Sequence, residues 1–387
     1  MRILQVIPRL SKKYGGGGVV IATTLAKELI KRGHQVWVVS SDYGLNEEEN
    51  DVVVTSPYGV FPSRSFLNIA TLHYTPYIGT HFESIIKSNP DIIHMQGVRT
   101  YQNIVAYRYA KKYKIPYIVD SHGFPIEGTW LRRVAIKIFD GLFANRICRD
   151  AKFCIAETQV GVEEFKRAGV KEDKIVVIPC GCDLSQFDNL PGKNRFRGKN
   201  NIGISKKIVL YLGGIEYIKG LDFLVKSFAK LEYKNAVLIL VGQDMGFKKT
   251  LDIMIDNLGI RDKVIFTGGL YGQDKLEALV DADVAVFPSR AEQGIPFAAI
   301  EAIMCNIPVI VTDGTGAAED LRKMKVGYIV KFGDIDELSQ GIETLLDYSR
   351  SDKNLSVKKA QSYIRKNLSI TERGKDYEKL YERCVNG

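Results

Sequence analysis

The stretch Ile208–Phe228, IVLYLGGIEYIKGLDFLVKSF, decides the fold of this chain. It begins with an apolar run that predicts a buried strand, turns at Gly213 and Gly214, and continues with apolar residues at helical spacing. A strand that leads through a tight turn into a helix is the repeating part of a βαβ unit. The stretch therefore predicts an α/β fold with a parallel sheet.

The same alternation of strands and helices recurs on both sides of this stretch. Apolar runs that predict further strands are RILQVI, QVWVVS, DIIHMQ, IPYIVDS, KFCIAE and KIVVIP before it, and AVLILVG, KVIFTGG, DVAVFPS and PVIVTD after it. The polar, basic segment 188–207 predicts a linker or a domain boundary. We expect two doubly wound, Rossmann-like α/β domains facing a cleft, residues 1–188 and 189–366, and a terminal helix over 367–387.

Composition narrows the class of protein. The 387 residues are 45% apolar and 26% charged, which excludes a disordered or fibrous chain. The net charge of +9 is scattered, so it indicates a solvated surface or attraction to anionic nucleotides or lipids rather than nucleic-acid binding. Absence of a membrane-spanning run and of signal-peptide features predicts a cytoplasmic protein. Cys180 and Cys182 are too close for a zinc pair, so we expect free thiols.

Four consecutive glycines, Gly15, Gly16, Gly17 and Gly18, separate the first predicted strand from the first predicted helix. Glycines let the backbone approach a ligand, and N–H groups at a helix start suit phosphate or sugar oxygens. A simple flexible loop is the alternative. Asp42 follows the next strand, where a ribose-binding acid would stand, but consecutive glycines lack the dinucleotide-binding spacing.

Two histidines belong to predicted strands or their ends. His122 directly follows the strand IPYIVDS, at the carboxyl end where open α/β sheets bind ligands. Such a His can donate a hydrogen bond or exchange protons near neutral pH, and a loop His without a role is the alternative. His94 lies within DIIHMQ and is expected to be structural.

Two turns in the second half suit a nucleotide. Lys219 and Gly220 follow the glycine turn of the opening stretch and precede a helix, a combination that attracts a diphosphate without P-loop spacing. In SRAEQGIPFAAIEAIMCNIPVIVTD, residues 289–313, Glu292 and Glu301 flank a Gly-Ile-Pro turn. A carboxylate there can accept hydrogen bonds from two ribose hydroxyls. A solvated Lys and a solvated helix cap are the respective alternatives.

Together these motifs resemble a known family. The glycine run, DSHG, IPCGCDLSQF, GGIEYIKG, VIFTGG, ADVAVFPS and GIPFAAIEAIMCNIPVIVTD occur in the order found in the retaining glycosyltransferases of family 4, which have the GT-B fold. The resemblance implies a nucleoside-diphosphate-sugar donor in the C-terminal domain and an acceptor in the N-terminal domain. It also implies a final helix that crosses back to the N-terminal domain, and neither metal nor cofactor.

The resemblance assigns roles to residues. His122 matches a residue near the transferred sugar, Lys219 the Lys that binds the diphosphate, and Glu301 the acid that holds the ribose hydroxyls. Gly15 to Gly18 match the loop that approaches acceptor and donor, and Glu319 matches an acid of less defined role. The other donor-binding positions are Gly213, Gly214, Gly268, Gly269, Gln293, Gly294, Ile295, Pro296 and Phe297.

Two positions depart from the family pattern. Gln293 stands in place of the first acid of E-x7-E, and Gly214 in place of an Arg in the phosphate loop. A lost charge-assisted bond weakens donor binding by roughly 1.5 to 3 kcal/mol. Arg290 is a replacement cation by position, and Glu292 could replace the missing acid if the turn shifts by one residue.

The expected reaction is transfer of a sugar to a hydroxyl of a glycan, glycolipid or small molecule. The resemblance implies front-face attack, in which the leaving phosphate takes the acceptor proton. The alternatives are a sugar-nucleotide epimerase on the same scaffold and a binding protein with weakened catalysis. A dehydrogenase is disfavoured by the glycine spacing.

The stretch 130–149, WLRRVAIKIFDGLFANRICR, is basic and apolar at helical spacing. Such a helix rests on an anionic membrane, or packs on the sheet with its Arg residues exposed. The first alternative places the protein peripherally at the inner face of the membrane.

Overall fold

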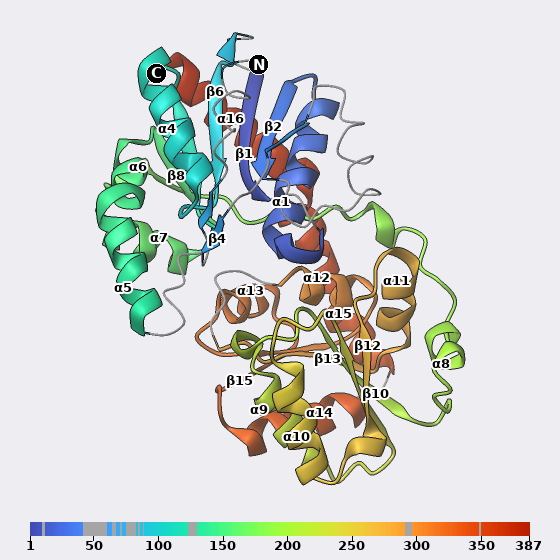
Figure 1. Ribbon diagram of the computed structural model, residues 1–387. Coiled ribbons are helices and arrows are strands. Elements are labelled where there is room, and N and C mark those ends of the chain that lie inside the picture. Colours follow the sequence, from blue (N-terminus) through green and yellow to red (C-terminus); the bar gives the residue numbers. More distant parts are fainter. Residues whose placement is uncertain are drawn as a thin grey trace. The chain divides into compact units, whose positions relative to one another are not determined.

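The computed structural model describes residues 1–9, 12–41, 60–63, 67–69, 72–74, 83, 86, 87, 89–122, 130–290, 296–347 and 350–387. They form two compact units (Figure 1): unit 1 combines Met1–Asp183 with Leu368–Gly387, and unit 2 is Leu184–Asn367. The sequence predicts the corresponding boundaries at residues 188 and 366.

A parallel sheet forms the centre of unit 1. Its strand order is β3-β2-β1-β6-β7-β8-β9, from Val60–Ser63, Gln35–Ser41, Arg2–Arg9, Ile92–Gln96, Tyr117–Asp120, Phe153–Ala156 and Ile175–Val177. A separate antiparallel pair joins β4 (Leu67–Ile69) to β5 (Leu72–Tyr74). The central strands β6 and β7 are buried along their whole length, because helices cover both faces of the sheet.

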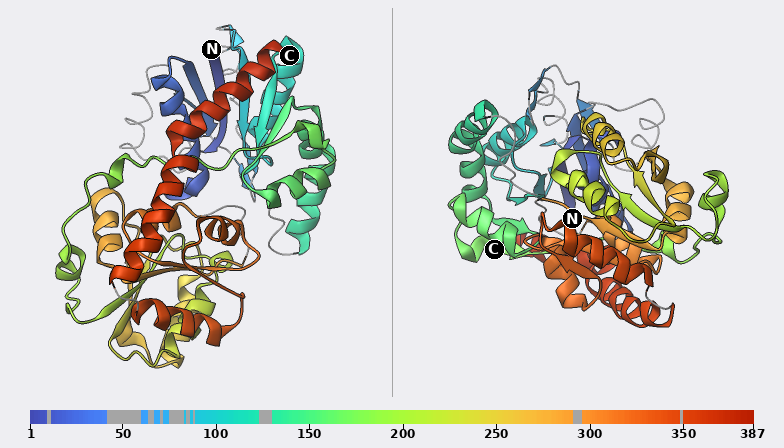
Figure 2. Two further views of the ribbon diagram at one scale, coloured as in Figure 1. Left: turned by 180° about the vertical axis from the view of Figure 1, so that it is seen from behind. Right: turned by 90° about the horizontal axis from the view of Figure 1, so that it is seen from below.

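Helices cover unit 1 on both sides. One face packs against α1 (Lys12–Lys31) and α16 (Ile370–Asn386), whose Leu25, Leu29, Leu380 and Tyr381 join the core. Figure 2 shows α16 in red, running along unit 1. The other face packs against the helices α4 (Tyr101–Tyr113), α6 (Asn145–Asp150) and α7 (Gln159–Arg167). The helix α5 (Trp130–Phe139) continues through a π-helical turn, η1 (Asp140–Ala144), into α6.

Unit 2 repeats this architecture. Its parallel sheet has the order β12-β11-β10-β13-β14-β15, from Val264–Gly268, Ala236–Val241, Lys207–Leu212, Val284–Phe287, Val309–Thr312 and Tyr328–Val330. One face packs against α9 (Leu221–Ala229), α10 (Lys248–Asn257) and α14 (Ile335–Asp347). The other helices of the described chain are α8 (Arg195–Lys199), α11 (Gly272–Asp281), α12 (Phe297–Met304), α13 (Gly316–Met324) and α15 (Arg350–Asn367). The predicted pair of parallel α/β sheets is confirmed.

Each sheet has a point where the strand order reverses. In unit 1 it lies between β1 and β6, and in unit 2 between β10 and β13. Ligands of open α/β sheets bind beyond the carboxyl ends of the strands at such points. The fold therefore predicts ligand contacts in the loops after β1, β6, β10 and β13.

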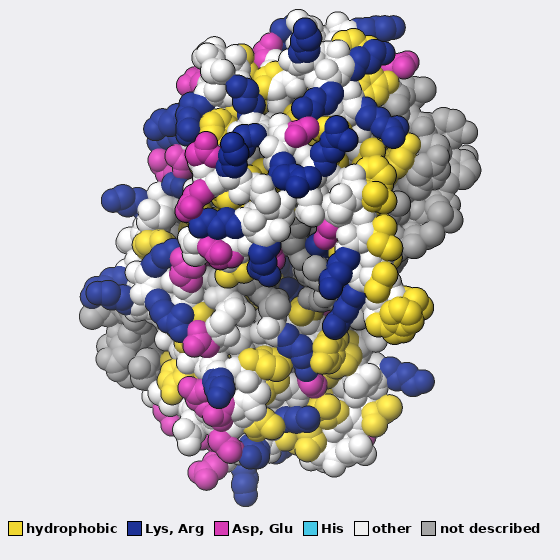
Figure 3. Space-filling model, turned by 90° about the vertical axis from the view of Figure 1, so that its left-hand side faces the viewer, with side chains coloured by type: hydrophobic (Ala, Val, Ile, Leu, Met, Phe, Trp, Pro, Cys, Tyr) yellow, Lys and Arg dark blue, Asp and Glu magenta, His cyan; other side chains and the backbone are white. Residues whose placement is uncertain are grey.

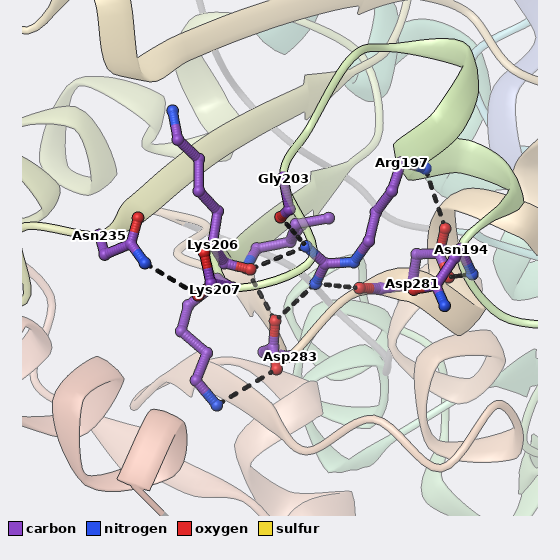
Figure 4. A network of polar contacts seen from close by, with 10 residues as sticks. Asn194, Arg197, Gly203, Lys206, Lys207, Asn235, Asp281 and Asp283 are labelled. Carbon is purple, nitrogen blue, oxygen red and sulfur yellow. Dashed lines mark hydrogen bonds and ion pairs between the residues drawn. The ribbon is translucent and has the colours of Figure 1, made fainter.

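The segment 188–207, which the sequence predicts as a linker or a domain boundary, is packed into unit 2. It contains α8, and Arg197 is only 7% exposed. The Arg197 guanidinium donates to the carbonyls of Gly203, Lys206 and Asp281 and to the carboxylate of Asp283 (Figure 4). A buried guanidinium carries five N–H donors and needs several acceptors. Because Arg197 finds some of these acceptors on Asp281 and Asp283, its bonds fix the segment to the rest of unit 2.

Candidate functional site

His122 lies just past the end of β7 in a left-handed backbone conformation, with φ of 45°. Its Nδ1 is 2.7 Å from Glu157 Oε1, and its Nε2 is 3.0 Å from Gln96 Oε1. Gln96 ends β6 and Glu157 follows β8, so three neighbouring strands contribute. A non-glycine residue in this conformation is strained, and such strain is concentrated at functional sites.

Asp120 adds a second acid beneath the ring of His122. Its Oδ1 lies 3.5 Å from His122 Nδ1, and Tyr377 from α16 donates a hydrogen bond of 2.8 Å to its Oδ2. The side chain of Asp120 is 1% exposed, and its Oδ1 has no hydrogen-bond partner among the described residues. The cluster is therefore buried, charged and incompletely hydrogen-bonded.

Burial and neighbouring charges set the protonation of the cluster. Burial by itself lowers the pKa of His122, but the carboxylates of Asp120 and Glu157 together raise it by more, so that the pKa is about 9. Burial raises the pKa of Asp120 to about 6. Burial also raises the pKa of Glu157, but the hydrogen bond and the charge of His122, together with a hydrogen bond from Cys180, leave that pKa below the usual value. His122 is consequently an imidazolium at neutral pH.

Asp120, His122 and Glu157 also have the spacing of a metal site, with one ligand atom of each within 4.8 Å of the others. A metal ligand must be a deprotonated nitrogen or carboxylate. The raised pKa of His122 keeps a proton on the ring, whose Nδ1 is hydrogen-bonded to Glu157 and lies 3.5 Å from Asp120 Oδ1. The donor set thus fits a shared proton better than a metal.

His94 is structural, as the sequence predicts. It is fully buried in β6, and its Nδ1 lies 2.9 Å from the hydroxyl of Tyr381 in α16. Burial, together with the charge of His122, lowers the pKa of His94 to about 3. The two neighbouring histidines therefore differ in charge at neutral pH.

The glycine run is helical, which corrects the expected loop. The helix α1 begins at Lys12 and includes Gly15 to Gly18. Each helical Gly costs about 1 kcal/mol relative to Ala, but the packing of Leu25 and Leu29 anchors the rest of α1. A Cβ on Gly18 would lie 3.9 Å from His122 Cδ2. The structure thus brings these two predicted features together, with a side-chain-free helix surface next to the ring.

In unit 2, Lys219 ends a 3₁₀ turn, Tyr217–Lys219, between β10 and α9. The next residue, Gly220, has φ of +66°, and a Cβ there would lie 2.0 Å from the carbonyl oxygen of Pro288. This close approach requires glycine. It holds the Lys219 turn against the segment after β13, at the point where the strand order reverses.

Arg290 lies beside the same turn but is engaged with protein groups. Its backbone N–H donates to Ile218, 2.8 Å away, and its Nη2 lies 2.6 and 2.8 Å from the carboxylate oxygens of Asp222. Its guanidinium also donates to the carbonyl of Tyr217 and stacks 3.9 Å from that ring. Arg290 therefore stabilises the turn. Because its guanidinium is engaged with Asp222 and Tyr217, these contacts speak against the hypothesis that Arg290 replaces the missing phosphate-binding cation.

Glu301 is buried in α12 and paired with Lys275 of α11. Lys275 Nζ lies 2.6 Å from Glu301 Oε1, and the two side chains are 19% and 10% exposed. Burial raises the pKa of Glu301, whereas the charge and hydrogen bond of Lys275 lower it. Lys275, which the sequence did not single out, thus keeps this carboxylate closer to its ionised form.

The remaining glycines bring strand ends together. A Cβ on Gly242, after β11, would lie 1.7 Å from the carbonyl oxygen of Gly213, so the two turns meet through bare backbone. Gly242 N–H also donates to Gly268 at the end of β12. A Cβ on Gly269 would lie 2.8 Å from Gln243 Nε2. Gly213, Gly214, Gly268 and Gly269 therefore lie along one edge of the sheet.

Pro296 and Phe297 begin α12. Glu292, Gln293, Gly294 and Ile295 lie outside the described residues, as does Asp42. Glu319 is in α13, where it pairs with Lys323 at 2.7 Å.

Family profiles match both halves of the chain. The family described as Glycosyltransferase Family 4 matches residues 15–186, and the family described as Glycosyl transferases group 1 matches residues 192–362. The chain belongs to glycosyltransferase family 4. The glycosyltransferase class applies to nearly the whole chain because the two matches follow one another.

Several curated proteins similar to this glycosyltransferase are themselves named as glycosyltransferases or synthases. An uncharacterized glycosyltransferase of Methanocaldococcus jannaschii, MJ1607, is 26% identical over 361 residues, covering 89% of each chain. N-acetyl-alpha-D-glucosaminyl L-malate synthase of Bacillus anthracis is 26% identical, covering 90% of this chain and 89% of that one. Alpha-monoglucosyldiacylglycerol synthase of Streptococcus pneumoniae is 26% identical, covering 84% and 74%.

The fold matches that of Anabaena Alr3699/HepE, solved in complex with UDP-glucose. The TM-score is 0.79 at 17% identity, and the match covers 99% of this chain and 100% of that chain. This likeness shows the GT-B fold.

Proposed function

We propose that the protein transfers a sugar from a nucleoside-diphosphate-sugar to an acceptor hydroxyl, with retention at the anomeric carbon and without a metal. The observation that carries this proposal is the edge of unit 2. There the Lys219 turn lies against the segment after β13, and Gly213 meets Gly242 after β11, which bonds to Gly268 at the end of β12. Bare backbone, a 3₁₀ turn and a Lys at a strand-order reversal favour a diphosphate. The UDP-glucose complex of HepE supports this donor class.

Glu301 is proposed to hold the ribose of the donor. Its carboxylate is buried and lies 2.6 Å from Lys275, so it is oriented before a ligand arrives. An ionised carboxylate can accept hydrogen bonds from two adjacent hydroxyls. Lys275 supports this role because it opposes the effect of burial on the pKa of Glu301.

The chemical step would then need little from side chains that exchange protons. The bond between the acceptor oxygen and the anomeric carbon forms as the bond from that carbon to the phosphate breaks, and the acceptor proton passes to the leaving phosphate. The protein positions the two reactants and stabilises the phosphate charge. His122 contributes as a fixed imidazolium and not as a base, since both ring nitrogens face oxygen acceptors.

The acceptor is proposed to be carried by lipid at the inner face of a membrane. The name of the Streptococcus pneumoniae relative, alpha-monoglucosyldiacylglycerol synthase, supports a glycolipid as the acceptor class. An alternative acceptor is a small molecule, as the name of the Bacillus anthracis relative suggests. Gly214 and Gln293 are expected to weaken donor binding or stabilisation of the sugar without abolishing transfer.

A donor screen followed by two variants tests this function. Thermal shifts with UDP-, GDP-, ADP- and dTDP-sugars should single out one base, because a ligand stabilises the state that binds it. In a transfer assay with that donor, Lys219→Ala and Glu301→Ala should lose most activity while remaining folded. Near-normal transfer by either variant would contradict the assignment. An isomerised donor in the absence of any acceptor would instead identify an epimerase.

A further inference from the structure

An apolar stripe lies exposed along α5 and η1. Trp130 is 71% exposed, Leu131 62%, Ile138 57% and Leu142 63%, and Val134 and Phe143 are exposed as well. The spacing of these residues places most of them on one side of the helix. Large apolar side chains gathered on one exposed surface mark an interaction site, whereas single ones do not.

The opposite side of the same segment is packed in unit 1. Ile136 is 7% exposed, and Ala144, Ile147 and Cys148 are buried in the core. The guanidinium of Arg99 holds Asp140 through two bonds, from Nε at 2.7 Å and from Nη2 at 2.9 Å. The segment is therefore docked in its native orientation, and the stripe faces outward.

Basic side chains accompany the stripe. Arg133, Lys137 and Arg146 are exposed, and the single acid in the stretch 130–149 is Asp140, whose charge Arg99 neutralises. Figure 3 faces the side on which α5 lies in Figure 1, and it shows a band of hydrophobic side chains with Lys and Arg beside it. The surface thus offers both apolar contact and positive charge.

We propose that this surface, residues 130–146, lies on a lipid bilayer with anionic headgroups. Trp, Leu and Ile enter the boundary between headgroups and acyl chains, while Arg and Lys contact lipid phosphates. None of the helices in the described part of the chain is long and apolar enough to span a bilayer. Membrane binding would bring the transferase to a lipid-borne acceptor, and in this respect the inference rests on the proposed function.

A second copy of the chain is a poorer occupant. A two-fold interface would place the basic residues of one stripe against those of the other, and the single acid of the stretch 130–149, Asp140, is already paired with Arg99. An anionic bilayer has the complementary charge over the whole surface.

Binding of the full chain to vesicles tests the proposal. The chain should bind vesicles of phosphatidylcholine mixed with phosphatidylglycerol, and about tenfold more weakly vesicles of phosphatidylcholine alone. Leu131→Gln/Ile138→Gln should abolish binding. Ile204→Gln/Ile253→Gln, which changes side chains 80% and 56% exposed in unit 2, is the matched control and should bind normally. Arg133→Gln/Lys137→Gln should weaken binding to anionic vesicles and reduce its dependence on salt.

Several results would overturn the proposal. The first is that the wild-type chain does not bind vesicles. The second is that both apolar double variants lose vesicle binding equally. The third is that the wild-type chain forms a dimer and binds no vesicles, and that Leu131→Gln/Ile138→Gln dissociates this dimer. The donor screen on the same preparations separates the two claims. A donor-dependent thermal shift without vesicle binding removes the membrane surface alone, and vesicle binding without any donor shift removes the proposed donor chemistry alone.

Discussion

The two units each bury a charged network, and the two networks differ in place and in completeness. Around Arg197 in unit 2, Asp283 precedes β13 and Lys207 begins β10, so the network lies at the amino ends of the strands. The guanidinium donates to four different oxygens. Around His122 in unit 1, the network lies at the carboxyl ends of strands, and Asp120 Oδ1 and Gln96 Nε2 have no hydrogen-bond partner among the described residues.

This difference indicates that the Arg197 network serves stability and that the His122 network serves function. A network in which one buried guanidinium has several acceptors fixes a segment, here the stretch of unit 2 that contains α8. A network with unpaired polar atoms, a strained His and a raised pKa stores an electrostatic cost that folding alone does not require. Substitutions in the two networks should consequently affect different measurements.

The largest effect on stability is expected from Arg197→Met. Loss of the buried guanidinium leaves Asp283, whose side chain is 21% exposed, beside fewer donors, which should lower the free energy of unfolding by about 3 kcal/mol. Urea denaturation measures this change, and Arg197→Lys should lose less because it keeps the charge. Transfer activity per folded molecule should be unchanged. An equal loss of activity would show that the network also serves the site.

Glu157→Gln should act mainly on activity and on pH dependence. The pKa of His122 is raised to about 9 in the folded protein, so its stabilising contribution is complete below its unfolded pKa of about 6.5 and is lost as pH rises through 9. Removing the carboxylate should lower the pKa of His122 by about one unit or more and move this loss to lower pH. NMR titration of His122, with His122→Asn as the assignment control, measures the pKa. An unchanged value would contradict the ion pair.

Asp120→Asn should cost less than either change. The side chain keeps an oxygen that accepts from Tyr377, and it loses a charge whose Oδ1 has no hydrogen-bond partner among the described residues. The pKa of Asp120 is raised to about 6, so its effect on stability becomes unfavourable as pH rises from about 4 to 6. The variant should remain within about 1 kcal/mol of the wild type at pH 7. A loss as large as that of Arg197→Met would remove the distinction between the networks.

Lys275→Gln is expected to have the smallest effect. Burial already raises the pKa of Glu301, and loss of Lys275 should raise it further, so less carboxylate remains ionised as pH falls. Affinity for the nucleoside diphosphate should fall about threefold to tenfold, and more at pH 6 than at pH 8. Calorimetric titration at both pH values measures this. Lys323→Gln, which removes an exposed ion pair with Glu319, is the matched control.

The sequence predicted what local patterns determine. Apolar runs located the strands, and the rule that ligands bind at carboxyl ends selected His122 and Lys219. It did not select Glu157 or Lys275, because their partners are 35 and 26 residues away and the pairing depends on the assembled fold. One signal was available: Glu157 is the last residue of KFCIAE, and His122 directly follows IPYIVDS, so neighbouring strand ends predict their approach.

Packing outweighed local preference in two segments. The glycine run has low helix propensity, but α1 extends through it from a well-packed body. The segment 188–207 is polar enough for a linker, but Arg197 found acceptors within unit 2. Neither interaction is visible in the composition of the segment itself.

Binding of nucleoside diphosphates tests the central claim, which is that unit 2 grips the donor through the Lys219 turn and Glu301. UDP, GDP, ADP and dTDP are titrated against the wild type, Lys219→Gln and Glu301→Gln, with inorganic pyrophosphate as a competitor. We predict that one diphosphate binds and that each variant weakens it about tenfold or more. Lys219→Gln should also weaken pyrophosphate, whereas Glu301→Gln should not. Wild-type affinity in both variants, or no binding of any of the four, would contradict the account.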